Sequence, residues 1–237
     1  MISSKTCSII ANLYNFSYAI VVVFQRRQMP LTRDGQLTVE KTPSYFITTN
    51  VPRRVLRMST EVRLIVVLRD PVTRAVSDFT QTCAKRRRTT PTFEQLAFVG
   101  DGNATTKTVN TSWRAIHIGL YAVHVRRWLD QFSADQLHFV SGERLIADPT
   151  GVLNDVQDFL RLRRIITADH FRFNHDKGFP CVVRDPQRAP DDVHCLGKSK
   201  GRTHPVIHRA ALKQLKDFFR PHNEDLYRLT HINFGWP

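Results

Sequence analysis

The chain has 237 residues, 41% of them hydrophobic, which is enough for one α/β domain with a full core and excludes a disordered chain. Its formal net charge of +14 predicts attraction to polyanions such as nucleic acid, an anionic membrane, or a sulfated or phosphorylated glycan. The four cysteines lack the CxxC spacing typical of zinc sites, so we expect no structural metal.

In chain order, the predicted strands and helices alternate. Residues 1–27 form a separate amino-terminal segment whose apolar part, 7–24, is a candidate weak membrane anchor. Residues 28–237 carry the alternating pattern, which predicts a single α/β domain with a mostly parallel sheet flanked by helices. We expect strands at 36–40, 64–68 and 137–140, and helices at 52–58, from 71 onward, at 116–132, at 152–160, at 205–219 and from 221 onward.

Residues 64–79 are the most informative stretch. An apolar run, typical of a buried parallel strand, ends at Arg69, and Pro71 then opens a helical pattern. Ligands of open α/β sheets bind at the carboxyl ends of the strands. The guanidinium of Arg69 and the hydroxyl of Ser77 are therefore candidates for gripping a phosphate. The alternative is that Arg69 forms a salt bridge with Asp70 or Asp78.

Cysteine and asparagine positions point to the secretory pathway. Cys181 and Cys195 are close in sequence, and a disulfide between them would imply an oxidising compartment. Asn103 and Asn110 begin triplets that match the glycosylation acceptor pattern, as does Asn15.

Three segments together carry a family resemblance. Residues 40–46 place a lysine at a strand end, Arg69-Asp70-Pro71 with Ser77 places a phosphate grip at another, and residues 198–204 form a basic loop with a glycine. This set resembles the Golgi sulfotransferases, most closely the heparan sulfate glucosaminyl 3-O-sulfotransferases. The resemblance covers about residues 28–237. Further matching segments are 78–82, 139–145, 177–181 and 234–236.

The resemblance implies a P-loop-kinase-like sulfotransferase fold in the Golgi lumen. It implies transfer of a sulfuryl group from 3′-phosphoadenylyl sulfate to the 3-hydroxyl of glucosamine in heparan sulfate, with no metal required. Cys181 and Cys195 match the family's disulfide. The residues matching its donor site are Arg69 and Ser77 for the 3′-phosphate, and Lys200, Gly201, Arg202, Thr203 and His204 for the loop that covers the nucleotide.

The same resemblance assigns the acceptor side. Lys41 matches a lysine near the transferring sulfuryl group, where positive charge stabilises an anionic transition state. The residues that match the glycan border are Lys41, Thr42, Pro43 and Ser44, and those that match the acceptor cleft are Gln81, Thr82, Cys83, Ala84 and Lys85.

Residues 1–27 depart from the family pattern. The family's first strand, its glycine-rich phosphosulfate loop and its glutamate base have no counterpart there, so we expect the fold without that strand and loop. Residues 17–24 are a candidate replacement strand, rich in β-branched residues. Glu40 is the carboxylate nearest to Lys41 in sequence, but its side chain should point to the opposite face of the strand.

Two functions therefore stay open. The first is a heparan sulfate glucosamine 3-O-sulfotransferase. The second is a non-catalytic relative or inactive fragment that binds heparan sulfate without modifying it. A nucleic-acid-binding module is suggested by charge alone, and the sequence lacks any reader motif for it.

Overall fold

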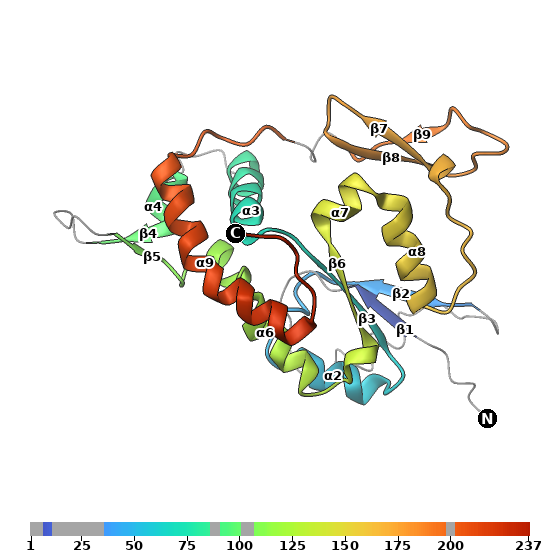
Figure 1. Ribbon diagram of the computed structural model, residues 1–237, viewed down its shortest axis with the longest axis horizontal. Coiled ribbons are helices and arrows are strands. Elements are labelled where there is room, and N and C mark those ends of the chain that lie inside the picture. The colour runs from blue at the N-terminus through green and yellow to red at the C-terminus, as the bar shows by residue number, and fades with distance from the viewer. Residues whose placement is uncertain (1–6, 11–35, 86–90, 101–106, 198–201) are drawn as a thin grey trace. The chain divides into compact units, whose positions relative to one another are not determined.

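The computed structural model describes residues 7–10, 36–85, 91–100, 107–197 and 202–237 (Figure 1). The chain forms two compact units and passes between them several times. The first unit consists of the described residues up to 68, together with 123–140 and 154–164. The second is drawn from 69–122, 141–153 and 165–237.

The first unit holds a four-stranded sheet in the order β2-β1-β3-β6. The central strand β1 pairs in parallel with β2 on one side and with β3 on the other. The apolar run in β3 is buried at Leu64, Ile65, Val66 and Leu68, which confirms the predicted buried strand. The strands are β1 (Cys7–Ile10), β2 (Thr38–Lys41), β3 (Arg63–Leu68) and β6 (Leu137–Ser141).

The expectation of a sheet without its first strand is wrong. Strand β1 lies between β2 and β3, with Ser8 opposite both Val39 and Arg63. An open position there would leave the backbone groups of two strands unpaired, and a short segment ending in two isoleucines is suited to fill it. Residues 17–24, the candidate replacement strand, lie outside the described residues. None of the helices within the described ranges is long and apolar enough to cross a membrane.

Side chains in the first unit secure the connections around the sheet. The indole of the buried Trp128 donates a hydrogen bond to the Phe46 carbonyl at 3.1 Å. The amide of Gln136 donates to the Thr60 and Val62 carbonyls at 2.8 and 3.0 Å, which fixes the start of β3. The helices that contribute to this unit are α2 (Val51–Met58), α6 (Tyr121–Leu129), the 3-10 turn η1 (Ala134–Gln136) and α8 (Pro149–Phe159).

The second unit packs helices around an apolar core. Phe93, Ile116, Leu215 and Phe219 are almost fully buried there, and α9 lies beside α3 (Figure 1). Its helices are α3 (Pro71–Lys85), α4 (Phe93–Ala97), α5 (Arg114–Ile118), α7 (Gly142–Ala147), the 3-10 turn η2 (Ala168–His170) and α9 (Arg209–Thr230). Its strands are β4 (Phe98–Val99), β5 (Thr108–Val109), β7 (Phe171–Asn174), β8 (Phe179–Val183) and β9 (Val193–His194).

Some predicted helix boundaries are wrong, among them the start of the helix expected from 205, which begins at Arg209. The helical pattern over 116–132 is divided into α5 and α6 around Gly119. A Cβ on Gly119 would lie 2.9 Å from the Phe219 ring, so the glycine marks a close approach between α9 and this turn. Conversely, α9 continues through Pro221 as one helix, because its buried face runs on from Phe219 to Leu226.

The predicted disulfide is confirmed. Cys181 in β8 and Cys195 after β9 form a bond with a Cα–Cα distance of 4.5 Å. The sheet of β7, β8 and β9 is antiparallel throughout. The bond therefore ties the segment after β9 to the middle strand of this sheet.

We predict that replacing Cys181 and Cys195 together by alanine lowers the free energy of unfolding by about 3 kcal/mol, since the bond closes a loop with a sequence separation of 14. Denaturant unfolding of the variant and the parent chain measures this difference. Cys83→Ala, which removes a thiol that is not part of the disulfide, is the control and should change it by less than about 1 kcal/mol. Equal stability of the double variant and the parent would contradict the prediction.

Candidate functional site

The turn between β3 and α3 fixes the position of Arg69. Asp70 caps α3, because its Oδ1 accepts the Thr73 backbone N–H at 2.7 Å. Pro71 follows at the first helical position, where a backbone N–H is not needed. The backbone that carries Arg69 is therefore well defined immediately after the strand ends.

Arg69 lines a cavity of about 280 Å³ within the second unit. Helix α3 contributes Ser77, Thr80 and Gln81, which share one helical face because they are three and four residues apart. The other lining residues come from the α7 region, the β7–β8 turn and the segment before α9: Ile146, Lys177, Gly178, Phe179, Arg202 and His204. The structure thus brings together Arg69, Ser77, Gln81, Arg202 and His204 of the predicted site residues.

The cavity suits an anion that carries an apolar ring. Arg69, Lys177 and Arg202 give it positive charge, and its described lining residues include no aspartate or glutamate. The Ser77 hydroxyl and Gln81 amide add neutral hydrogen-bonding groups. Ile146 and Phe179 provide an apolar wall. Such a combination matches a phosphorylated or sulfated ligand better than a purely apolar one.

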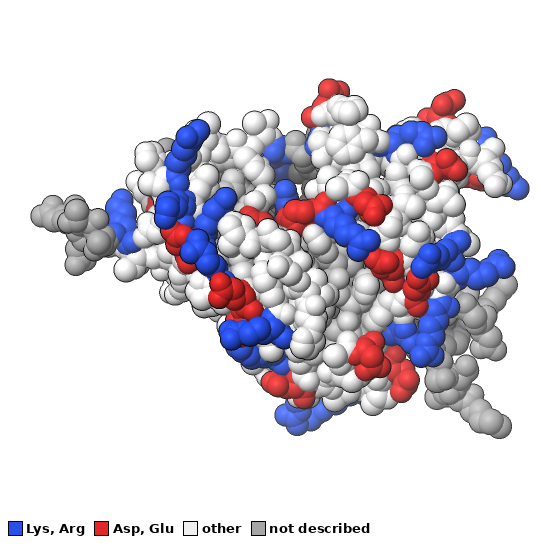
Figure 2. All heavy atoms as spheres, viewed as in Figure 1, with Lys and Arg blue, Asp and Glu red and all other residues white. Residues whose placement is uncertain are grey.

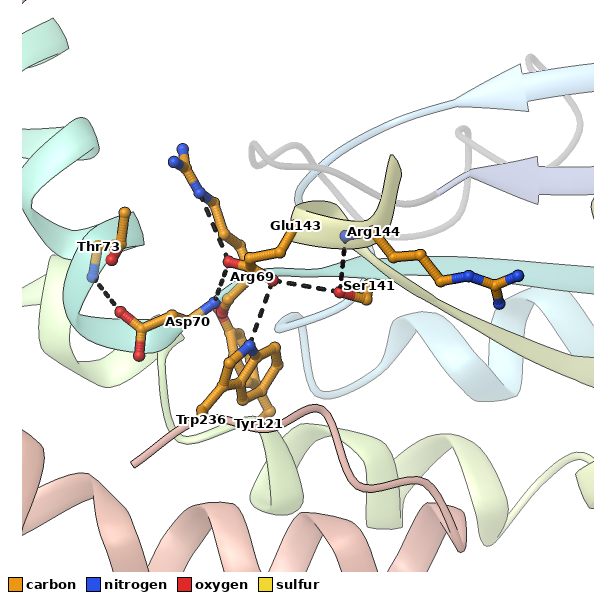
Figure 3. Close-up of polar contacts among 8 residues, drawn as sticks. All are labelled: Arg69, Asp70, Thr73, Tyr121, Ser141, Glu143, Arg144 and Trp236. Atoms are coloured by element: carbon orange, nitrogen blue, oxygen red, sulfur yellow. Dashed lines mark hydrogen bonds and ion pairs between the residues drawn. The ribbon is translucent and has the colours of Figure 1, made fainter. Parts of the chain in front are cut away.

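The acidic partner of Arg69 is Glu143 of α7, whose Oε1 lies 3.7 Å from Arg69 Nε (Figure 3). The sequence suggested Asp70 or Asp78 instead. Asp70 caps α3, and Asp78 pairs with Arg74 at 3.6 Å. The salt-bridge alternative was therefore right about the type of interaction and wrong about the partner.

His204 faces the same positive charge. Burial, and then the nearby guanidinium of Arg69, lower the pKa of His204 below its usual value of 6.5. The imidazole is therefore neutral near pH 7 in the free protein. A bound anion would favour its protonated form.

Most of the other residues predicted for the donor and acceptor sites either do not line this cavity or lie outside the described residues. Thr203 is exposed and does not line the cavity, while Lys200 and Gly201 lie outside the described residues. A helix turns about 100° per residue, so five consecutive residues of α3 cannot all face one cavity. Gln81 lines it, Thr82 and Ala84 are exposed, Cys83 is half-buried, and Lys85 is the last residue of α3.

The predicted glycan-border residues belong to the first unit. Lys41 ends β2 with an exposed side chain, followed by the half-buried Thr42 and Pro43 and the buried Ser44. Glu40 points to the opposite face of β2, as expected from strand alternation. Its carboxylate accepts a hydrogen bond from the Thr42 hydroxyl, and burial raises its pKa.

Several residues of the site could not be named from the sequence. Glu143, Lys177 and Phe179 lie in segments quoted for the resemblance, but no residue-type pattern distinguished them. Thr80 could have been found from the three-residue spacing to Ser77 on the same helical face. The contacts of the others depend on tertiary packing.

Of the three glycosylation triplets, the one that begins at Asn110 lies within the described residues. Asn110 uses its side-chain nitrogen, the atom that a glycan would occupy, to donate to the Leu96 carbonyl at 2.9 Å. Its Oδ1 accepts the Ser112 backbone N–H at 3.2 Å. A glycan on Asn110 would replace one hydrogen of the side-chain nitrogen and leave one N–H to donate to the Leu96 carbonyl. Asn103 lies outside the described residues.

Several cations of α9 are paired with acidic side chains. Along α9, Lys and Arg side chains alternate with acidic ones (Figure 2). Asp217 pairs with Lys213 at 2.6 Å and with Arg220 at 2.7 Å. The cavity differs from this surface because its cations have no acid among the described lining residues.

Comparison with known proteins decides the family. The model of the sulfotransferase domain matches residues 27–227. This chain belongs to the sulfotransferase family. It is 52% identical over 225 residues to human heparan sulfate glucosamine 3-O-sulfotransferase 3B1, covering 95% of this chain and 56% of that protein. It is 46% identical over 226 residues to human heparan sulfate glucosamine 3-O-sulfotransferase 6, covering 95% of this chain and 64% of that protein.

These relatives confirm the resemblance to the heparan sulfate 3-O-sulfotransferases. The chain spans little more than half the length of the 3B1 enzyme. A solved sulfotransferase from Alicyclobacillus acidocaldarius is 19% identical, with a TM-score of 0.62 over 88% of this chain and 70% of that one. That likeness confirms the α/β sulfotransferase fold.

We predict that Arg69→Ala weakens the binding of inorganic sulfate by about tenfold or more, because it removes a charge-assisted hydrogen-bond donor from the cavity. An NMR titration of the chain with sulfate measures this affinity. The control is Arg228→Ala, which removes the same charge from an exposed α9 position that pairs with Asp225. Equal losses in the two variants would show that only net charge matters.

We also predict that sulfate affinity rises as the pH falls from about 7.5 to about 5, since His204 gains a proton more readily beside a bound anion. Sulfate keeps its charge over this range, so the dependence reports on the protein. His204→Asn should remove most of it, and His222→Asn on α9 should leave it intact. A pH dependence that survives in His204→Asn would contradict this assignment.

Proposed function

We propose that this chain is a heparan sulfate glucosamine 3-O-sulfotransferase. It would move the sulfuryl group of 3′-phosphoadenylyl sulfate to the 3-hydroxyl of glucosamine. The observation that carries the proposal is the cavity in which Arg69 and Ser77 meet Arg202 and His204, in a chain that shares half its residues with enzymes of that name.

The cavity supports the donor in three respects. Arg69 and Ser77 offer a guanidinium and a hydroxyl to a 3′-phosphate. Arg202 and His204 lie on the segment that the resemblance assigns to cover the nucleotide. Phe179 gives an aromatic wall to which an adenine ring is suited. Hydroxyl, guanidinium and ring together match a phosphorylated nucleotide better than a bare inorganic anion.

Transfer of the sulfuryl group breaks its bond to the phosphate oxygen of the donor and forms a bond to the glucosamine oxygen. The hydroxyl proton passes to a general base, a role to which we assign no residue of this chain. We assign Lys41 to stabilise the charge that develops on the transferring group. The resemblance places Thr42, Pro43 and Ser44 along the glycan, with the acceptor segment that begins at Gln81. These roles need no metal ion.

The alternative is a chain that binds heparan sulfate without transferring sulfate. The observation that favours it concerns Glu40, the carboxylate nearest to Lys41 in sequence. Its oxygen atoms are engaged by the hydroxyls of Thr42 and Tyr45, and it lies on the opposite face of β2 from Lys41. Glu40 is therefore unsuited to accept the acceptor's proton.

The proposed compartment is the Golgi lumen, and the proposed partner is the heparan sulfate chain rather than nucleic acid. The Cys181–Cys195 disulfide supports an oxidising compartment. We leave membrane attachment out of the proposal.

The test is transfer of radiolabelled sulfate from 3′-phosphoadenylyl sulfate to heparan sulfate by the purified chain. We expect label at glucosamine O-3, and we expect Lys41→Ala to reduce the rate by about 100-fold because one charge-stabilising donor is lost. Lys107→Ala, an exposed lysine in the second unit, is the control. No incorporation, together with salt-sensitive binding to heparin, would establish the non-catalytic alternative.

A further inference from the structure

We infer that Glu143 is a positioning residue for the donor site, which holds the Arg69 guanidinium in the orientation that presents its terminal nitrogens to a phosphate. The inference rests on the proposed function, because it concerns the same cavity. It assigns a role to a carboxylate that does not line the cavity itself.

Glu143 stands at the centre of a hydrogen-bonded cluster (Figure 3). Its Oε1 accepts the Asp70 backbone N–H at 2.9 Å and lies 3.7 Å from Arg69 Nε. Its Oε2 accepts the indole N–H of Trp236 at 3.2 Å and the Ser141 hydroxyl at 3.3 Å. Both oxygens are therefore engaged, and the carboxylate has a defined orientation.

Trp236, which fixes one side of this carboxylate, is itself held tightly. Its ring is buried and stacks on Phe234 with centroids 4.6 Å apart. Its backbone N–H donates to the Tyr227 hydroxyl at 2.9 Å, and the Asn223 amide donates to the Pro237 carbonyl at 3.0 Å. Side chains of α9 thus hold the last residues of the chain in place, and Trp236 in turn holds Glu143.

The backbone of Arg69 is held independently of Glu143. The Tyr121 hydroxyl donates to the Arg69 carbonyl at 2.8 Å. Burial raises the pKa of Tyr121 to about 12, so the phenol stays protonated and remains a donor. Arg69 is consequently held at its backbone by the Tyr121 hydrogen bond, and its side chain is paired with Glu143.

This arrangement leaves one end of the guanidinium for a ligand. Arg69 Nε is buried and forms no hydrogen bond within the described residues, so it meets Glu143 as an ion pair, whereas the side chain as a whole is 39% exposed and lines the cavity. Figure 3 shows the terminal nitrogens pointing away from Trp236 and Tyr121. A guanidinium that is already oriented loses less conformational freedom when a phosphate binds, which favours affinity.

Because Glu143 is negatively charged, a positioning role and a simple counter-charge role predict opposite changes in anion affinity when it is replaced. A carboxylate beside Arg69 lowers the positive potential that an anion meets. If Glu143 acted only as a counter-charge, Glu143→Ala and Glu143→Gln would both tighten anion binding. A positioning role predicts weaker binding in both. The glutamine variant should lose less affinity than the alanine variant, because its oxygen still accepts the Asp70 N–H. It should still lose some, because its amide nitrogen cannot accept the hydrogen bonds of Trp236 and Ser141.

The experiment is isothermal titration of the full chain with adenosine 3′,5′-bisphosphate, the desulfated form of the proposed donor. We expect Glu143→Ala to raise the dissociation constant about tenfold, and Glu143→Gln and Trp236→Phe about threefold each, in keeping with the loss of an ion pair together with hydrogen bonds or of single hydrogen bonds. In an Arg69→Ala background, Glu143→Ala should have no further effect, because Glu143 acts through Arg69.

Asp217→Asn is the control, since it makes the same charge change at an exposed position of α9. Melting temperatures identify any variant that fails to fold, and Glu143→Gln and Trp236→Phe then decide the question. Unchanged or tighter binding in these variants, with a binding wild type, would overturn the positioning role alone. A wild-type chain that does not bind the nucleotide would overturn the proposed donor as well.

Discussion

The candidate site depends on how the chain leaves β3 and enters α3. An arginine at the end of a buried strand contributes to binding only if its backbone and side chain are both held in place. Here Asp70 caps the helix, Tyr121 binds the Arg69 carbonyl, and Glu143 joins the Asp70 N–H to the Arg69 guanidinium. The Asp70 N–H and the Arg69 carbonyl are thus bonded by groups from α7 and α6, which makes the backbone of this turn resistant to change.

The cavity next to this turn is suited to bind an anion. Net charge alone does not identify a binding site, because cations on α9 are neutralised by neighbouring acids such as Asp217. Arg69, Lys177 and Arg202 converge on one space without such a neighbour among its described lining residues. Glu143 approaches only the Nε side of Arg69, so the carboxylate orients the guanidinium without entering the space where a ligand would lie.

Much of the architecture could be predicted from the sequence, because it depends on local patterns. The apolar run ending at Leu68 and the proline at position 71 gave the strand and helix that position Arg69, and close spacing gave the disulfide. Strand β1 escaped prediction because four residues carry too little periodicity to be recognised. The division at Gly119 depends on the Phe219 ring, which comes from a distant part of the sequence.

For the site as well, residues that follow local patterns could be predicted and those that depend on tertiary contacts could not. Arg69 could be named because it follows a strand end, and Ser77 because it lies about two turns into the helix that comes next. Glu143 and Trp236 could not be assigned a role, since their contact joins residues 93 positions apart. Asp78 was the natural partner for Arg69 by sequence distance, yet it pairs with Arg74 one helical turn away on α3.

The most direct test of this account is a crystal structure of the chain bound to adenosine 3′,5′-bisphosphate. The account predicts the 3′-phosphate in contact with the terminal nitrogens of Arg69 and the hydroxyl of Ser77, with Glu143 still beside Arg69 Nε. A nucleotide bound elsewhere, or a 3′-phosphate that contacts neither Arg69 nor Ser77, would contradict it.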